Sequence, residues 1–129
     1  MAIYGILIWT VSNLETKYGI FDKKQIEEYK DKLHKKLFWL LVYKDPKTCK
    51  KYENVNFKKY FTFLMKEIDG LNEVLLYPEV IVELMSLLEA AFIETESLNF
   101  NYAAYRKLIL DAHSLVDLLD KRGDIDEHQ

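Results

Sequence analysis

Cysteine, glycine and proline are scarce in this sequence, and each shortage excludes a class of structure. Its 129 residues include one cysteine, four glycines and two prolines. The single cysteine, Cys49, cannot form an internal disulfide, so a disulfide-stapled secreted scaffold is excluded and a cytoplasmic location is expected. So few turn-forming residues argue against a fold of many short strands.

Targeting, membrane and cofactor signals are also missing. Residues 1–11 are apolar, but no Lys or Arg precedes them and no small-residue cleavage site follows. A stretch of eleven residues is too short to span a bilayer. One cysteine and three dispersed histidines offer no metal-ligand spacing. We therefore expect a soluble protein with no cofactor, no metal and no membrane contact.

The chain has enough apolar side chains for one core. Half of its residues are hydrophobic and 14% are aromatic, which excludes disorder for most of the chain. At this length we expect one domain over residues 1–122, followed by an acidic flexible tail over 123–129. Apolar residues after residue 20 recur with helical period. We predict an all-α fold without a sheet: a compact single-domain bundle of four long helices plus an N-terminal helix.

Capping and breaking residues predict where the helices begin and end. Residues 3–18 have helical spacing with Gly19 as a C-terminal cap. The run 6–11 is rich in residues that favour strands, so a strand there is the alternative. The next helix starts at Asp22, which forms a capping box with Gln25. The later starts are predicted at Asn54 or Asn56, at Pro78, and at Ser97 or Asn99. The last helix is expected to run to about Arg122.

Each predicted helix carries one apolar stripe that we expect to face the core. Leu64, Leu88 and Leu115 are the centres of three of these stripes. In the last helix the predicted stripe consists of Tyr105, Leu108, Ala112, Leu115, Val116 and Leu119.

Charge is divided between the two halves of the chain. Residues 1–66 hold 14 Lys or Arg and 7 Asp or Glu, whereas residues 67–129 hold 4 and 14. The formal net charge of −3 therefore hides a polarised molecule. Such a molecule either closes its basic elements against its acidic ones or offers a partner a one-signed face. We expect lysine faces on the second and third helices and carboxylate faces on the fourth and fifth.

Residues 38–43 are apolar on every side of the predicted second helix, so they are either fully buried or part of an interface. With the polarised surface, they favour a small helical protein that binds another protein, a second copy of itself included. A regulator, adaptor, inhibitor or immunity-type protein has such a surface. The expected anchors are Phe38, Trp39 and Tyr43, for which ordinary core is the alternative. The expected acidic face consists of Glu79, Glu83 and Glu94.

The loop after the second helix is rich in lysine and contains Tyr52 and Phe57. Basic charge interleaved with aromatic residues can hold single-stranded nucleic acid by phosphate contact and base stacking. The candidate residues are Lys47, Lys50, Lys51, Lys58 and Lys59. Only two arginines and a pI of about 5.6 favour a solvated loop instead. The same lysines favour the thiolate of Cys49, but no Cys–His motif accompanies it.

Arg106 and His113 lie on one line of the predicted last helix, because seven residues complete about two turns. Asp117 follows one turn later, where it can hold the imidazole. The spacing Arg106-x6-His113 resembles the motif of the HEPN superfamily, which comprises all-helical domains of about this size. The resemblance implies a metal-independent ribonuclease with the motif at a dimer groove. Arg106 would stabilise phosphate charge and His113 would act as acid or base.

The ribonuclease is the alternative to protein binding, and protein binding accounts for more of the sequence. The motif involves one helix, whereas the charge division involves the whole chain. The Arg106–His113 line lies opposite the apolar centre of its helix, so it is expected to face water or a second subunit.

Overall fold

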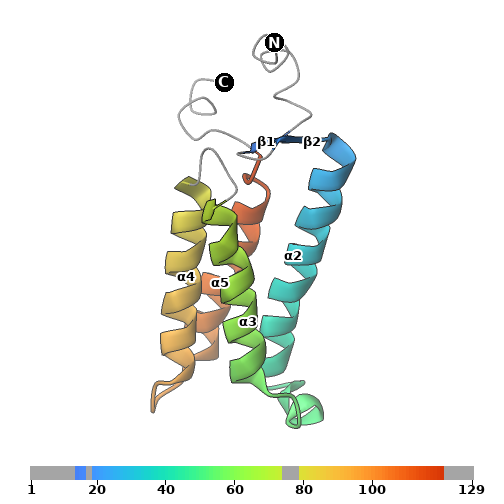
Figure 1. Ribbon diagram of the computed structural model, residues 1–129. Coiled ribbons are helices and arrows are strands. Elements are labelled where there is room, and N and C mark those ends of the chain that lie inside the picture. The colour runs from blue at the N-terminus through green and yellow to red at the C-terminus, as the bar shows by residue number, and fades with distance from the viewer. Residues whose placement is uncertain (1–13, 17–18, 74–78, 121–129) are drawn as a thin grey trace.

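The computed structural model describes residues 14–16, 19–73 and 79–120. Within these ranges the chain forms four long α-helices that pack side by side (Figure 1). They are α2 (Lys23–Lys44), α3 (Phe57–Gly70), α4 (Glu79–Thr95) and α5 (Tyr102–Val116). Two short 3-10 helices, η1 (Cys49–Tyr52) and η2 (Leu71–Glu73), follow α2 and α3. The predicted bundle of four long helices is confirmed.

A short β-hairpin precedes the bundle and corrects part of the predicted N-terminal helix. β1 (Leu14–Thr16) pairs antiparallel with β2 (Gly19–Phe21), with Thr16 opposite Gly19. The expectation of no sheet is therefore wrong at this point. Two residues separate the strands, and this is the commonest hairpin connection, so local pairing replaces the helical turn that Gly19 was expected to end. The rest of that prediction lies outside the described residues, as do Pro78 and the tail 123–129.

Each helix of the bundle packs on two neighbours. α2 packs on α3 and α5, and α4 also packs on α3 and α5. α2 and α4 therefore occupy opposite corners, and they lie at the right and left edges of Figure 1. Both run from the hairpin end of the bundle toward the η1 end, while α3 and α5 run back. This arrangement decides where the opposite charges of the chain lie.

Side-chain caps set the starts of α2 and α3. Asp22 Oδ1 accepts from the Gln25 amide at 2.8 Å, and Gln25 Oε1 accepts from the Asp22 amide at 3.0 Å. The predicted capping box is thus confirmed. Asn56 caps α3 by accepting from the Lys59 amide at 3.0 Å, and this was one of the two predicted starts.

α5 is shorter than predicted at both ends. It begins after Asn101, whose side chain accepts from the Ala104 amide at 3.1 Å, and not at either predicted position. It ends at Val116, after which the backbone closes turns of the 3-10 type instead of continuing to Arg122. A tightened last turn of this kind is a common way for a helix to satisfy its final carbonyls.

The core lies between the four helices and is almost entirely apolar. Of the three predicted centres, Leu64 and Leu88 are buried, whereas Leu115 is only half-buried. On α5 the fully buried line is Tyr105, Ile109, Ala112 and Val116. The stripe is therefore turned toward Ile109 and away from Leu115, because α5 packs between α2 and α4 and only its central line is covered from both sides.

Candidate functional site

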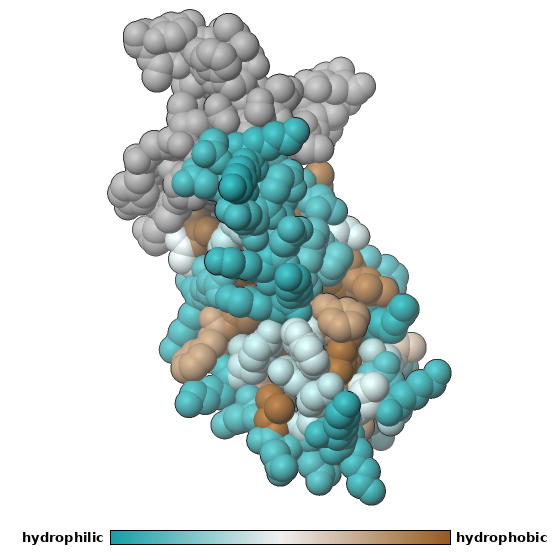
Figure 2. Space-filling view, turned by 90° about the vertical axis from the view of Figure 1, so that its right-hand side faces the viewer, coloured by the Kyte–Doolittle hydropathy of each residue, from teal (hydrophilic) through white to brown (hydrophobic). Residues whose placement is uncertain are grey.

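The C-terminal half of α2 exposes aromatic side chains. Phe38 and Trp39 keep 54% and 37% of their surface exposed, while Leu40 between them and Tyr43 is fully buried. Residues 38–43 are thus not buried on every side, and Phe38 and Trp39 are not ordinary core residues. Figure 2, which faces α2, shows hydrophilic side chains over its upper half and paler, more apolar ones over its lower half.

Four of these rings hold one another in place. The Trp39 centroid lies 5.6 Å from that of Tyr43 and 5.5 Å from that of Tyr52 in η1. Tyr43 and Tyr52 are 5.7 Å apart, and Phe38 meets the edge of Trp39 at 6.3 Å. Tyr43 also meets Tyr60 of α3 at 5.4 Å, with the rings perpendicular. Such tilted and edge contacts fix ring orientation. Phe38, Trp39, Tyr43 and Tyr52 are called the aromatic surface below.

Hydroxyl groups from three other parts of the chain donate to backbone carbonyls of this half of α2. These bonds run from Tyr60 to Lys36 at 3.1 Å, from Tyr105 to Leu40 at 2.8 Å, and from Thr48 to Val42 at 2.6 Å. Burial, and then the neighbouring Tyr43 and Glu67, raise the pKa of Tyr60 to about 12. Burial also raises the pKa of Tyr105. Both phenols therefore stay protonated and remain donors at neutral pH.

Three exposed lysines accompany the aromatic surface. Lys35 precedes Trp39 by one turn of α2, and Lys50 and Lys51 directly precede Tyr52. The Lys51 ammonium lies 5.7 Å from the Tyr52 ring centroid. None of the three lysines forms an ion pair with a residue in the described ranges. We call them the lysine rim, because they give the aromatic surface an uncompensated positive edge.

The lysines predicted to contact nucleic acid are all exposed: Lys47, Lys50, Lys51, Lys58 and Lys59. Two of them lie on α3 and have other contacts. The Lys58 ammonium lies 3.8 Å from Glu96 Oε1, just after α4, and the Lys59 ammonium lies 5.6 Å from the Phe63 ring centroid. Cys49, in the same loop, is a half-buried free thiol at the start of η1.

The predicted acidic face is only partly assembled. Glu79 and Glu83 are exposed one turn apart on α4, and Glu89, which was not predicted, is exposed on the same helix. Glu94 is half-buried, and its Oε2 accepts from the Asn101 amide at 3.0 Å. Glu94 therefore closes the turn between α4 and α5.

Opposite charges lie at opposite corners of the bundle. α2 contains seven lysines and three acidic residues, whereas α4 contains four glutamates and no basic residue. The predicted carboxylate face on the fifth helix is wrong. α5 contains two basic residues, Arg106 and Lys107, and one acidic residue, Asp111. The acidic residues Asp117 and Asp120 come after the helix has ended. No ion pair between described residues joins α2 to α4, which lie at opposite corners, so the glutamates of α4 do not neutralise α2.

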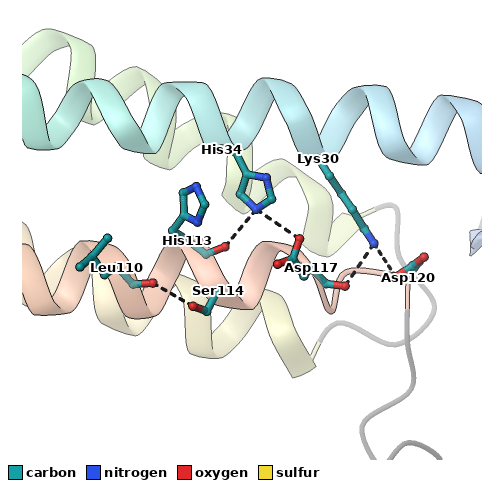
Figure 3. A network of polar contacts seen from close by, with 7 residues as sticks. All are labelled: Lys30, His34, Leu110, His113, Ser114, Asp117 and Asp120. Atoms are coloured by element: carbon teal, nitrogen blue, oxygen red, sulfur yellow. Dashed lines mark hydrogen bonds and ion pairs between the residues drawn. The ribbon is translucent and has the colours of Figure 1, made fainter.

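The residues of the HEPN-like motif lie in different environments. Arg106 is exposed, whereas His113 is half-buried and its ring stacks on that of His34 in α2 (Figure 3). One face of the His113 ring thus packs on a helix of its own chain, whereas the sequence predicted that this residue points away from the bundle; part of its surface stays exposed. Asp117 Oδ1 lies 3.3 Å from His34 Nε2, so this carboxylate holds the other imidazole. Burial lowers the pKa of His113, His34 lowers it further, and Asp117 acts in the opposite direction.

A buried lysine completes this polar cluster. The Lys30 ammonium donates to the Asp117 carbonyl at 3.1 Å and to Asp120 Oδ1 at 2.9 Å (Figure 3). Only 7% of Lys30 is exposed, and no other charged residue in the described ranges is as deeply buried. A cation at this point satisfies a terminal carbonyl of α5 and opposes the negative end of its dipole. The cluster therefore joins α2 to the end of α5.

Comparisons with known proteins give no relative. The chain has no significant match among protein-family models, curated proteins or solved structures. Among the described residues, no helix is long and apolar enough to cross a membrane. The same residues contain no group of three or more His, Cys, Asp or Glu side chains that could hold a metal ion.

Proposed function

We propose that this protein acts by binding another protein through the aromatic surface, with the lysine rim favouring an acidic partner. The observation that supports the proposal is the ring cluster itself, which is exposed at Phe38 and Trp39 and attached to the bundle through Tyr43. Trp and Tyr are the side chains that most often dominate binding energy at protein interfaces. An adaptor, an inhibitor or an immunity-type protein needs only such a surface.

The local structure around the rings favours tight and selective binding. Side chains that are already held by neighbouring rings lose little conformational entropy when a partner covers them. Lys35, Lys50 and Lys51 lack ion pairs within the described chain, so an acidic partner gains attraction without first breaking an existing pair. This attraction acts mainly on the association rate and weakens as salt is added.

Site-specific photocrosslinking tests the proposal in cells of the source organism. A benzophenone amino acid replaces Phe38 in one strain and Phe63 in another. The two positions are matched, because both are phenylalanines on long helices with 54% and 57% of their surface exposed. We expect a discrete protein adduct from position 38 that survives ribonuclease treatment and is lost in the Lys35→Glu/Lys51→Glu variant. Adducts from position 63 alone, or adducts from 38 that ribonuclease removes, would contradict protein binding at this surface.

The alternative function is a metal-independent ribonuclease of HEPN type, with Arg106, His113 and Asp117 as its catalytic residues. This function requires an accessible His113, whereas the ring of His34 covers one face of the His113 imidazole. Purified protein is incubated with mixed single-stranded RNA, with and without chelator. Under our proposal RNA remains intact between about pH 5 and pH 8, the range in which a histidine acid or base works. Chelator-resistant cleavage that is lost in folded His113→Ala would establish the ribonuclease instead.

A further inference from the structure

The outer side of α4 is an exposed face that no other described element covers. Val82 and Ile93 keep 59% and 68% of their surface exposed. Positions 82, 86, 89 and 93 lie within about 60° of one another on a helix, so these two apolar residues form one line. Exposed Ala90 and the exposed carboxylates of Glu79, Glu83 and Glu89 lie on or beside that line. Together these residues are called the α4 face.

The three glutamates of the α4 face have no ion-pair partner among the described residues. Glu89 lies on the line between Val82 and Ile93, and Glu79 and Glu83 lie beside Val82, so the face carries negative charge that no described residue pairs with. The aromatic surface has the opposite arrangement, with exposed Phe38 and Trp39 at its centre and the lysine rim beside them. The two surfaces therefore both expose apolar side chains and are opposite in charge.

One molecule cannot bring these two surfaces together. α2 and α4 occupy opposite corners of the bundle, with α3 and α5 between them. Two copies have no such restriction, because the aromatic surface of one copy can meet the α4 face of another. The pair would then keep one surface of each kind free for further copies: the α4 face of the first copy and the aromatic surface of the second.

We propose that the partner of the aromatic surface is the α4 face of a second copy of this chain. The inference rests on the proposed function and names its partner. Contact between two different surfaces is heterologous, so the copies add head to tail and build either a ring or an open chain, not a closed two-fold dimer. The lysine rim pairs with the glutamates of the α4 face, while Phe38 and Trp39 pack on exposed apolar side chains of that face.

Two charge-reversed variants test this pairing. Lys35→Glu/Lys51→Glu makes the lysine rim negative, so that both surfaces of the molecule carry negative charge. Glu79→Lys/Glu83→Lys makes the α4 face positive, so that both surfaces carry positive charge. All four positions are exposed and have no ion pair with a described residue, so the variants are expected to fold, and their thermal unfolding checks this. Lys24→Glu/Lys66→Glu is the control for the first variant, because it changes net charge by the same amount at exposed lysines that belong to neither surface.

Sedimentation velocity measures association of each sample from about 10 μM to 1 mM, the range of weak protein contacts. Wild type and the control are expected to associate with concentration and to dissociate as salt rises. Each charge-reversed variant alone should associate at least about tenfold more weakly. An equimolar mixture of the two variants should recover association, because each negative surface then meets a positive one. The variant that carries all four substitutions should also recover it.

Three results would overturn the inference: wild type that stays monomeric over the whole range, a mixture that does not associate, or charge-reversed variants that associate as strongly as wild type. The first of these leaves the proposed function intact if position 38 crosslinks to a different protein. If position 38 gives no protein adduct and wild type stays monomeric, the proposed function fails as well.

Discussion

The imidazole rings of His34 and His113 stack with their centroids 4.0 Å apart and their planes inclined by 23°. His34 Nε2 donates to the His113 carbonyl at 3.1 Å, so the two residues are joined by a hydrogen bond as well as by ring contact. Two imidazolium cations at this separation repel each other, and burial keeps solvent from screening them fully. A positive charge on His113 is therefore disfavoured.

The stacked pair predicts that the protein loses stability as it is acidified. Burial and His34 lower the pKa of His113 below its usual value, so the unfolded chain takes up the proton first as pH falls. Stability is therefore lost below about pH 6.5, the pKa of a free histidine, and regained above it. The unfolding temperature should drop between about pH 7.5 and pH 5, and it should drop less in His113→Gln. An equal drop in the variant would assign the effect to carboxylates instead.

Lys30 predicts a stability difference between two lysines of the same helix. Lys30→Met removes the donor from the Asp117 carbonyl and from Asp120, and it leaves both acceptors partly buried without their partner. The loss should be about 1–3 kcal/mol in denaturant unfolding. Lys32→Met is the control, because Lys32 is exposed, and it should change stability by less than about 0.5 kcal/mol. Equal effects at both positions would mean that the buried contact adds no net stability, which is the case for some buried ion pairs.

The orientation of α5 predicts unequal costs for two aliphatic truncations. Ile109→Ala should cost about 2–5 kcal/mol, because Ile109 is fully buried and its removal leaves a cavity. Leu115→Ala should cost about 1 kcal/mol, because a half-buried side chain has less apolar surface to lose. Urea unfolding of both variants measures the difference. A larger loss at Leu115 would show that α5 is rotated from the orientation described.

The position at which α5 starts predicts that Asn101, and not Asn99, stabilises the protein as the helix cap. Asn101→Ala removes the oxygen that accepts from the Ala104 amide and should cost about 1 kcal/mol. Asn99→Ala, two residues earlier in the turn, should leave stability within about 0.5 kcal/mol of wild type. Thermal unfolding of the two variants, measured side by side, checks where α5 starts. A larger loss of stability in Asn99→Ala than in Asn101→Ala would show that Asn99 is the cap.

Local signals predicted the parts of the fold that depend on neighbours in sequence. The Asp22–Gln25 capping box needs only three residues of separation, and the stripes of α2, α3 and α4 need only helical period. The orientation of α5 was harder to predict, because Ile109 and Leu115 are both aliphatic. Which of them lies at the centre of the buried stripe depends on how α5 packs between α2 and α4. The hairpin was missed because three-residue strands leave almost no periodic signal.

The candidate site depends on contacts across long sequence separations, so the sequence revealed only some of its members. Phe38, Trp39 and Tyr43 were found from one apolar run, but their contact with Tyr52 depends on how the loop returns to α2. His34 and Lys30 meet residues about 80 to 90 positions away. Lys30 did leave a signal, since it lies on the apolar stripe of α2, four residues after Ile26 and three before Leu33.

The hydroxyl groups of Tyr60, Tyr105 and Thr48 change how the end of α2 opens. Helix ends ordinarily fray, and their amide protons then exchange with solvent through local unfolding. Here the carbonyls of residues 36, 40 and 42 are bonded to α3, to α5 and to the loop. The last turns of α2 can therefore open only when several elements separate together. A partner would then meet the aromatic surface already in its bound shape, and association would be limited by encounter instead of by rearrangement.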